Sequence, residues 1–286
     1  MMPLAAITDE FSPDLERALG AMAAVGMTGA ELRVIGGKNI IDLSDAEVDD
    51  ARRAIEARGM KILSIASPLL KCVLPDAAPI DPRFQQDIFG SSYTFEDQAR
   101  LTTRAFEIAR RTGAGIIRVF SYWRTVDPAQ CFDRVVTALA DLAEQAAARD
   151  VVIGLENEPA CNIATAAETA AVLAAVPHPN LQMIWDPANA LVAGESPFPG
   201  GYALIPRERL IHVHAKDCTV RDHTPAWCAV GDGAVDWRGQ IDALERDGYM
   251  GWLSLETHWK GPNGDKMEAS TICASRLRDL AQKAGS

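Results

Sequence analysis

Several features that would point to particular protein classes are missing from this sequence of 286 residues. No apolar stretch approaches the roughly 18 to 20 residues that a membrane-spanning helix needs, so we expect no membrane association. The first ten residues contain neither a basic region nor a long apolar core, and so do not resemble a secretory signal. The six cysteines are scattered without a Cys-x-x-Cys pair, which is typical of reduced thiols. These absences favour a cytoplasmic protein.

Positive charge is also scarce, since the formal net charge is −11. Neutralisation of phosphates dominates the affinity of proteins for nucleic acids, so we expect no nucleic-acid partner. The content of 48% hydrophobic and 23% charged residues is typical of a globular protein with a large core. We therefore expect a small-molecule partner, and we leave homo-oligomer formation open.

Short apolar segments alternate with helical segments along the whole chain. The helical segments carry start signals, such as Ser12 before Pro13 and the capping boxes that begin at Ser44 and Thr165. Between residues 67 and 94 a long polar connection follows the third strand, and we interpret it as a lid. The expected strands are 4–7, 29–33, 61–66, 116–120, 151–156, 181–186, 210–216 and 252–256.

This alternation predicts a parallel sheet, and the nearly continuous apolar strands predict that helices cover it. Eight such units favour a closed barrel over an open sheet. Thr8-Asp-Glu-Phe-Ser12, which follows the first strand, also lacks the glycines of a dinucleotide-binding turn. We predict an α/β fold, a single (β/α)8 TIM barrel domain over residues 1–286.

Four consecutive strands in the second half end in a residue that can bind a metal. In such barrels the chemistry lies at the carboxyl ends of the strands. Any one of these residues alone would be read as a solvated strand end, but three carboxylates at one point are costly without a cation. The oxygen-rich set predicts one divalent metal ion, with Mn²⁺ favoured and Mg²⁺ or Co²⁺ as alternatives. The predicted ligands are Glu156, Asp186, His214 and Glu256.

Neighbours of these ligands are candidate substrate-binding residues. His212 and Lys216 share the inward face of their strand with His214, although His212 is equally well explained as a core histidine. Glu158 belongs either to the site or to a loop salt bridge. Asn189 either binds a sugar hydroxyl or caps a turn.

The first half of the chain offers further candidates. Glu31 and Arg33 end the second strand, Arg118 lies in the fourth, and Trp123 lies in the loop after it. Arginine beside aromatic rings suits a polyhydroxylated or anionic substrate, but buried arginines paired with barrel carboxylates explain the pattern equally well.

The third group of candidates follows the seventh strand. Asp217 faces away from Lys216, so we interpret it as a structural partner or a cap. The turn Gly231-Asp-Gly233 is a weak signal for phosphate binding by backbone amides.

Five motifs resemble those of the sugar-phosphate isomerase/epimerase superfamily, the xylose-isomerase-like barrels, and the resemblance covers essentially the whole chain. They are Gly154-Leu-Glu-Asn-Glu-Pro159, Trp185-Asp-Pro-Ala-Asn-Ala190, His212-Val-His-Ala-Lys-Asp217, Gly231-Asp-Gly-Ala-Val-Asp-Trp237 and Leu253-Ser-Leu-Glu256.

The resemblance implies the same four metal ligands. By likeness to ketose 3-epimerases, Glu156 and Glu256 would also be the catalytic residues that exchange protons with the substrate. The zinc-dependent DNA-repair endonucleases of this superfamily need further histidines on early strands, and this chain has none before residue 178.

The leading hypothesis is a metal-dependent isomerase or epimerase of a small sugar, keto sugar or sugar acid, acting through an enediolate. The alternative is a dehydratase of the same superfamily, such as an inosose or dehydroshikimate dehydratase. A non-catalytic carbohydrate-binding barrel is a third reading.

Overall fold

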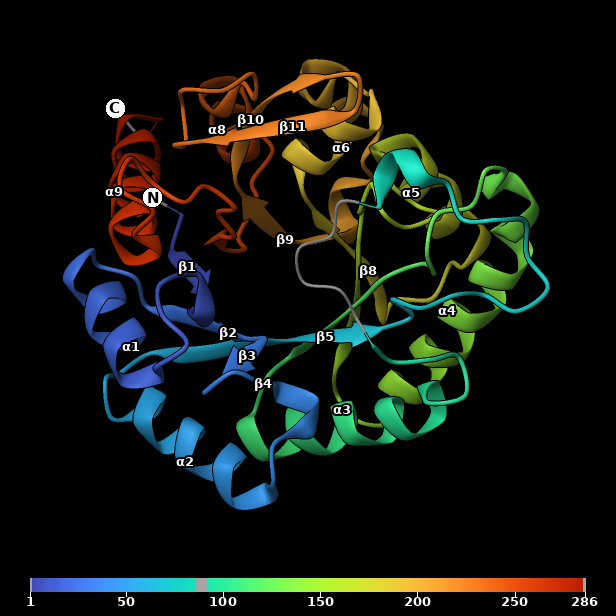
Figure 1. Ribbon diagram of the computed structural model, residues 1–286, viewed down its shortest axis with the longest axis horizontal. Coiled ribbons are helices and arrows are strands. Elements are labelled where there is room, and N and C mark those ends of the chain that lie inside the picture. Colours follow the sequence, from blue (N-terminus) through green and yellow to red (C-terminus); the bar gives the residue numbers. More distant parts are fainter. Residues whose placement is uncertain (1, 86–91, 285–286) are drawn as a thin grey trace.

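The computed structural model describes residues 2–85 and 92–284 and contains a closed barrel of eight parallel strands, with helices around its outside (Figure 1). The order around the barrel is β1-β12-β9-β8-β7-β6-β5-β2. The predicted TIM barrel is confirmed. Its strands are β1 (Leu4–Ile7), β2 (Gly29–Leu32), β5 (Lys61–Leu69), β6 (Ile116–Val119), β7 (Val152–Glu156), β8 (Leu181–Trp185), β9 (Leu210–Ala215) and β12 (Leu253–Leu255).

Most helix starts follow the capping signals in the sequence. Ser44 and Thr165 both form complete capping boxes. The first helix instead begins after Asp14, whose side chain accepts from the backbone N–H of Arg17, while Ser12 accepts from the N–H of Asp14. The prediction of Ser12 as N-cap was therefore wrong, because its hydroxyl closes the preceding turn.

The helices over the described residues are α1 (Leu15–Ala24), α2 (Asp45–Glu56), α3 (Gln98–Thr112), α4 (Phe132–Ala147), α5 (Ala166–Ala175), α6 (Pro187–Ala193), α7 (Tyr202–Leu204), α8 (Trp237–Arg246) and α9 (Lys266–Ala284). Short helical turns occur at Thr8–Glu10, Ile40–Asp42, Pro82–Phe84, Pro128–Cys131, Pro197–Gly201 and Arg207–Arg209.

In addition to the predicted barrel, the structure contains two hairpins that we did not predict. β3 (Val34–Ile35) pairs with β4 (Lys38–Asn39), and β10 (Asp217–Arg221) pairs with β11 (Thr224–Cys228). The second hairpin follows β9 directly and turns at Asp222 and His223, which both adopt positive φ angles. It therefore continues the chain from the carboxyl end of β9, where the candidate site lies.

The long connection after β5 starts later than we predicted, because β5 continues to Leu69. Its described part is fixed to the loop after β6: Ile80 pairs with Thr125, and the Asp81 N–H donates to the Arg124 carbonyl at 2.8 Å. Residues 86–91, which belong to the proposed lid, lie outside the described residues. In the described ranges, every helix is too short or too polar to cross a membrane.

Candidate active site

The four predicted metal ligands meet at the carboxyl end of the barrel. Glu156 ends β7, Asp186 follows β8, His214 lies in β9 and Glu256 follows β12. All four side chains are buried, and one ligand atom from each lies within 4.8 Å of the others. The parallel register brings these strand ends to the same height, so residues up to 100 positions apart converge.

The donor atoms of this cluster suit a divalent cation. His214 Nδ1 lies 3.0 Å from Glu156 Oε1 and 3.3 Å from Glu256 Oε2. Glu156 Oε2 and Asp186 Oδ2 are buried and accept no hydrogen bond. Buried polar atoms without partners are rare in native proteins and call for an ion or water. Three carboxylates and one imidazole with two such oxygens therefore fit a metal of the Mn²⁺ or Mg²⁺ kind, and also Zn²⁺.

The side chains of Lys216, Arg118 and Arg33 surround the carboxylates with positive charge. Lys216 Nζ lies 2.8 Å from Asp186 Oδ2 and 3.0 Å from Glu256 Oε2. Arg118 lies 3.2 Å from Glu156 and 3.4 Å from Glu256. The contacts to Glu156 Oε2 and Asp186 Oδ2 have ion-pair distances without hydrogen-bond geometry, so these oxygens keep lone pairs for a ligand.

Arg33, which follows β2, reaches the same carboxylates from the other side of the barrel. Its NH1 lies 3.1 Å from Glu256 Oε1, while Asp9 and Glu10 bind the remainder of the guanidinium. Of the two interpretations of the strand-end arginines, the structure shows Arg33 as a buried arginine paired with carboxylates of the barrel. The pattern contained the signal, because a strand-end arginine points toward the same edge as the acids.

Burial and charge shift the pKa values of the cluster in different directions. Burial raises the pKa of Asp186 to about 6, although Lys216 opposes this. Burial also favours a raised pKa for Glu256, but the positive charges of Lys216 and His214 outweigh it and lower this pKa well below its usual range. Burial disfavours the charged form of His214, but the carboxylates of Glu156 and its neighbours prevail and raise its pKa well above the usual value. Without a metal, His214 is therefore protonated at neutral pH.

A cavity of about 300 Å³ adjoins the cluster. Three of the predicted substrate-binding residues, Glu158, Asn189 and Lys216, line it. Asn189 also donates from its amide to the Asn157 carbonyl at 2.9 Å, so it serves the turn as well. The remaining lining residues are Phe84, Pro159, Ala160, Val192, His223, Pro225, Trp227 and His258.

The other three candidates lie elsewhere. Arg118 contacts the acids but does not line the cavity, and His212 lies in a layer below the metal ligands. Trp123 pairs with Cys161 in the loop region, with its ring 5.7 Å from the ammonium of Lys71.

Aromatic side chains that the sequence did not reveal as site residues border the cavity. Trp227 of β11 stacks on the ring of His258 with centroids 4.7 Å apart. Phe84 meets His223, at the tip of the β10–β11 hairpin, with centroids 4.8 Å apart. The hairpin and the connection after β5 thus meet beside the cavity. Trp227 was not identified from the sequence because the hairpin was not predicted, and Phe84 was not identified because its contact with His223 depends on that hairpin.

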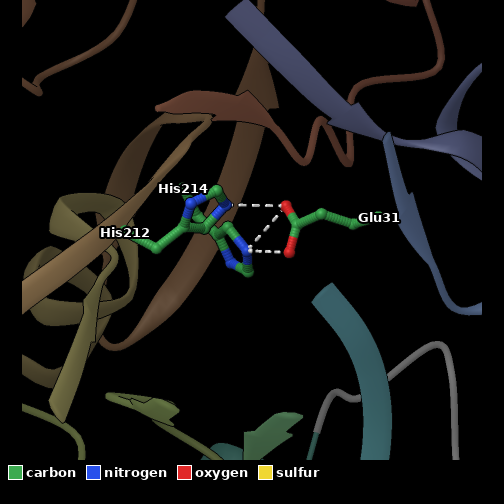
Figure 2. Close-up of side chains that lie close together, drawn as sticks. All are labelled: Glu31, His212 and His214. Carbon is green, nitrogen blue, oxygen red and sulfur yellow. Dashed lines mark hydrogen bonds and ion pairs between the residues drawn. The ribbon is translucent and has the colours of Figure 1, made fainter. Parts of the chain in front are cut away.

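Below the metal ligands, Glu31 faces His212 and His214 from across the barrel (Figure 2). Burial opposes ionisation of Glu31, but the two histidines outweigh it and lower the pKa of the carboxyl well below its usual value. Glu31 is therefore a carboxylate that only accepts hydrogen bonds.

The glycine turn after β11 donates hydrogen bonds to the carboxylate of Asp217. The N–H groups of Gly231 and Gly233 donate to Asp217 Oδ2, and those of Cys218 and Val235 donate to Oδ1, at 2.9 to 3.2 Å. The interpretation of this turn as a phosphate site was wrong, because the carboxylate occupies its amides. Asp217 has the structural role that its outward position indicated.

Residues 19–273 match the family model of the xylose isomerase-like TIM barrel. The chain belongs to this family. No curated protein matches its sequence significantly.

Solved structures with the same fold include a zinc-binding protein, a probable dehydratase and an epimerase. The IOLI protein with a bound zinc atom is 16% identical, with a TM-score of 0.77 and coverage of 99% of both chains. The probable 3-DHS dehydratase AsbF from Bacillus anthracis is 19% identical, with a TM-score of 0.71 and coverage of 97% of this chain and 99% of that one. An L-ribulose 3-epimerase is 18% identical, with a TM-score of 0.68 and coverage of 100% and 96%. At these identities the likeness shows the fold of this xylose isomerase-like barrel.

Proposed function

We propose that this barrel is a metal-dependent isomerase or epimerase of a small sugar, keto sugar or sugar acid. The observation that carries the proposal is a buried Glu–Asp–His–Glu set, within 4.8 Å, beside a cavity of about 300 Å³. The aromatic ring of Trp227 offers a surface for the C–H face of a sugar, while Glu158 and Asn189 offer partners for its hydroxyls.

The residues that would hold the metal are Glu156, Asp186, His214 and Glu256. The bound cation would polarise a carbonyl and its neighbouring hydroxyl, which makes the adjacent C–H more acidic. Glu156 and Glu256 approach His214 Nδ1 with separate oxygens, so two carboxylates border the same small space. One would remove the proton to form an enediolate, and the other would return a proton on the opposite face. Lys216 would stabilise the developing negative charge on oxygen.

Manganese is our proposed ion, with magnesium or cobalt as alternatives. The IOLI structure contains zinc, and a xylose isomerase-like barrel from Mycobacterium smegmatis, 16% identical with a TM-score of 0.67, contains magnesium. We further propose a single domain in a cytoplasmic protein.

A dehydratase is the second candidate. Its specific support is Lys216, whose ammonium lies 3.0 Å from Glu256 and also lines the cavity. After proton removal by Glu256, this ammonium would protonate the departing hydroxyl, which would leave as water. Glu156 Oε2 and Asp186 Oδ2 are buried and accept no hydrogen bond, although cations lie at ion-pair distance, and this supports a metal-dependent enzyme over the third reading.

Proton exchange tests the proposal. Manganese-loaded protein would be incubated in deuterated water with a panel of keto sugars and inososes, followed by mass spectrometry. An isomerase or epimerase should incorporate deuterium without loss of water, whereas a dehydratase should release water. The Glu256→Gln variant should lose the exchange by orders of magnitude, and the exposed control Glu208→Gln should keep it. A panel in which no substrate exchanges or loses water would overturn the proposal.

A further inference from the structure

A polar layer fills the barrel interior beneath the metal ligands. It contains Glu31 from β2, Ser64 from β5, His212 and His214 from β9, and Ser254 from β12, all with no exposed surface. Barrel interiors are usually packed with branched apolar residues, and an ionised carboxylate there is costly unless it is fully hydrogen-bonded. With the exception of His214, the proposed reaction does not use these residues, and none of them lines the cavity.

Four donors converge on Glu31. His212 Nε2 lies 2.9 Å from Oε1, His214 Nε2 lies 3.3 Å from the same oxygen, and the hydroxyls of Ser64 and Ser254 donate one to each oxygen. Figure 2 shows both imidazoles pointing their ring nitrogens at the carboxylate. Because a carboxylate can only accept, each of these Nε2 atoms must carry a hydrogen.

This arrangement determines what His214 offers on its other side. In a neutral imidazole with the hydrogen on Nε2, the lone pair resides on Nδ1. Nδ1 is the atom that lies 3.0 Å from Glu156 and 3.3 Å from Glu256. The tautomer that Glu31 selects is therefore the one that can bind a cation together with these carboxylates.

Glu31, His212 and His214 also lie close enough, within 4.8 Å, to be considered as ligands of a second cation. The hydrogen bonds of Glu31 disfavour a second cation at this position. Both carboxylate oxygens already accept from a serine hydroxyl and an imidazole, and a cation would have to displace these hydrogens. A single cation above the layer keeps every one of these hydrogen bonds.

We propose that Glu31 is a positioning residue, which holds His214 with Nε2 protonated and so presents its Nδ1 lone pair to the metal. The inference rests on the proposed metal site. Carboxylates that hold a metal-binding histidine typically contribute a factor of about 10 to 100 in metal affinity. His212 and the two serines complete the layer by holding Glu31 itself.

The test uses calorimetric titration of the metal-free protein with MnCl₂. Glu31→Gln keeps the size of the side chain but turns an N–H₂ group toward one imidazole, so we expect affinity to fall about 10- to 100-fold with one ion bound per chain. Glu31→Asp should restore part of the loss. Glu208→Gln makes the same change at an exposed position, so as the matched control it should leave the affinity unchanged.

Nitrogen NMR of the histidines in zinc-loaded wild-type protein supplies a readout that needs no variant. We expect His214 with a hydrogen on Nε2 and zinc on Nδ1, and this result supports the proposal even if Glu31→Gln fails to fold. The opposite tautomer, equal manganese affinity of wild type and Glu31→Gln, or two ions per chain with one lost in the variant would each overturn the role. Wild-type protein that binds no metal would overturn the proposed function itself, and this role with it.

Discussion

Metal affinity should depend on pH in a way that identifies the protons a cation displaces. The pKa of His214 is raised well above its usual value by the carboxylates around it, despite its burial, so the metal-free ring is charged at neutral pH. A metal bound to Nδ1 must expel that proton. The pKa of Asp186 is raised to about 6 by burial, so its carboxylate is free above this pH and carries a competing proton below it.

The expected magnitude follows from counting these protons. Above the pKa of Asp186 only His214 releases a proton, so the association constant should rise with pH by up to about tenfold per unit until the pH reaches the raised pKa of His214. Below about pH 6 the proton on Asp186 must leave too, and the dependence should approach about a hundredfold per unit. The sign is the same for both groups, because protons compete with the cation and affinity falls as the pH falls.

Calorimetry can measure the pH dependence of the association constant in both ranges, and also the number of protons released on binding. Metal-free protein would be titrated with MnCl₂ at several pH values, in buffers of different ionisation enthalpy. The dependence of the observed heat on the buffer gives the number of protons released. His178→Gln removes a histidine outside the cluster and should keep both slopes. An association constant that stays constant between pH 7 and pH 8 would refute the assignment of His214 as a protonated ligand.

Further predictions concern stability, substrate and metal. Asp217→Asn should lower the free energy of unfolding in urea by roughly 1 to 3 kcal/mol, because the part-buried N–H groups of Gly231 and Gly233 lose their acceptor. Asp232→Asn in the same turn, half-exposed, should change it by less than about 0.5 kcal/mol, and similar values for both variants would contradict this. Lys216→Met should abolish water release if the enzyme is a dehydratase, but leave slowed deuterium exchange if it is an isomerase; full turnover in the variant would remove the ammonium from both mechanisms. Trp227→Ala should raise KM more than it lowers kcat, since its ring borders the cavity rather than the acids, and an unchanged KM would contradict a stacking role. Chelation by EDTA should abolish activity and lower the Tm, with recovery of both on addition of Mn²⁺, and full activity in verified metal-free protein would contradict the metal hypothesis.

The strands and the acids at their ends could be predicted because both depend on local rules. An apolar run of strand length bounded by turn residues is visible in the sequence, and its last residue must lie at the carboxyl edge of a barrel. These rules predict from the sequence alone that Glu156, Asp186, His214 and Glu256 lie together. They fail for the β10–β11 hairpin, because its residues are largely polar and their pairing depends on a turn with positive φ angles at Asp222 and His223. With the hairpin, Trp227 was missed.

The contact between Glu31 and the two histidines could not be predicted for a different reason. Glu31 lies 181 residues before His212 in the sequence, and the two meet across the barrel interior, on strands that are not neighbours. Such a meeting depends on the stagger of all the strands together, which no local pattern encodes. The alternation along β9 nevertheless indicated that His212 faces inward.

β9 organises the whole site because its inward side chains act at successive depths. His212 binds Glu31 in the interior, His214 binds Glu31 with one nitrogen and the metal-site carboxylates with the other, and Lys216 reaches Asp186 and the cavity. The deepest of the three, His212, bonds Glu31 through Nε2 while its Nδ1 has no hydrogen-bond partner, and only the outermost faces the space for substrate. A shift of β9 by one residue would turn all three side chains away from the interior. The pairing of His214 with Ser254 of β12 opposes that shift, so the barrel register and the candidate chemistry are stabilised by the same contacts.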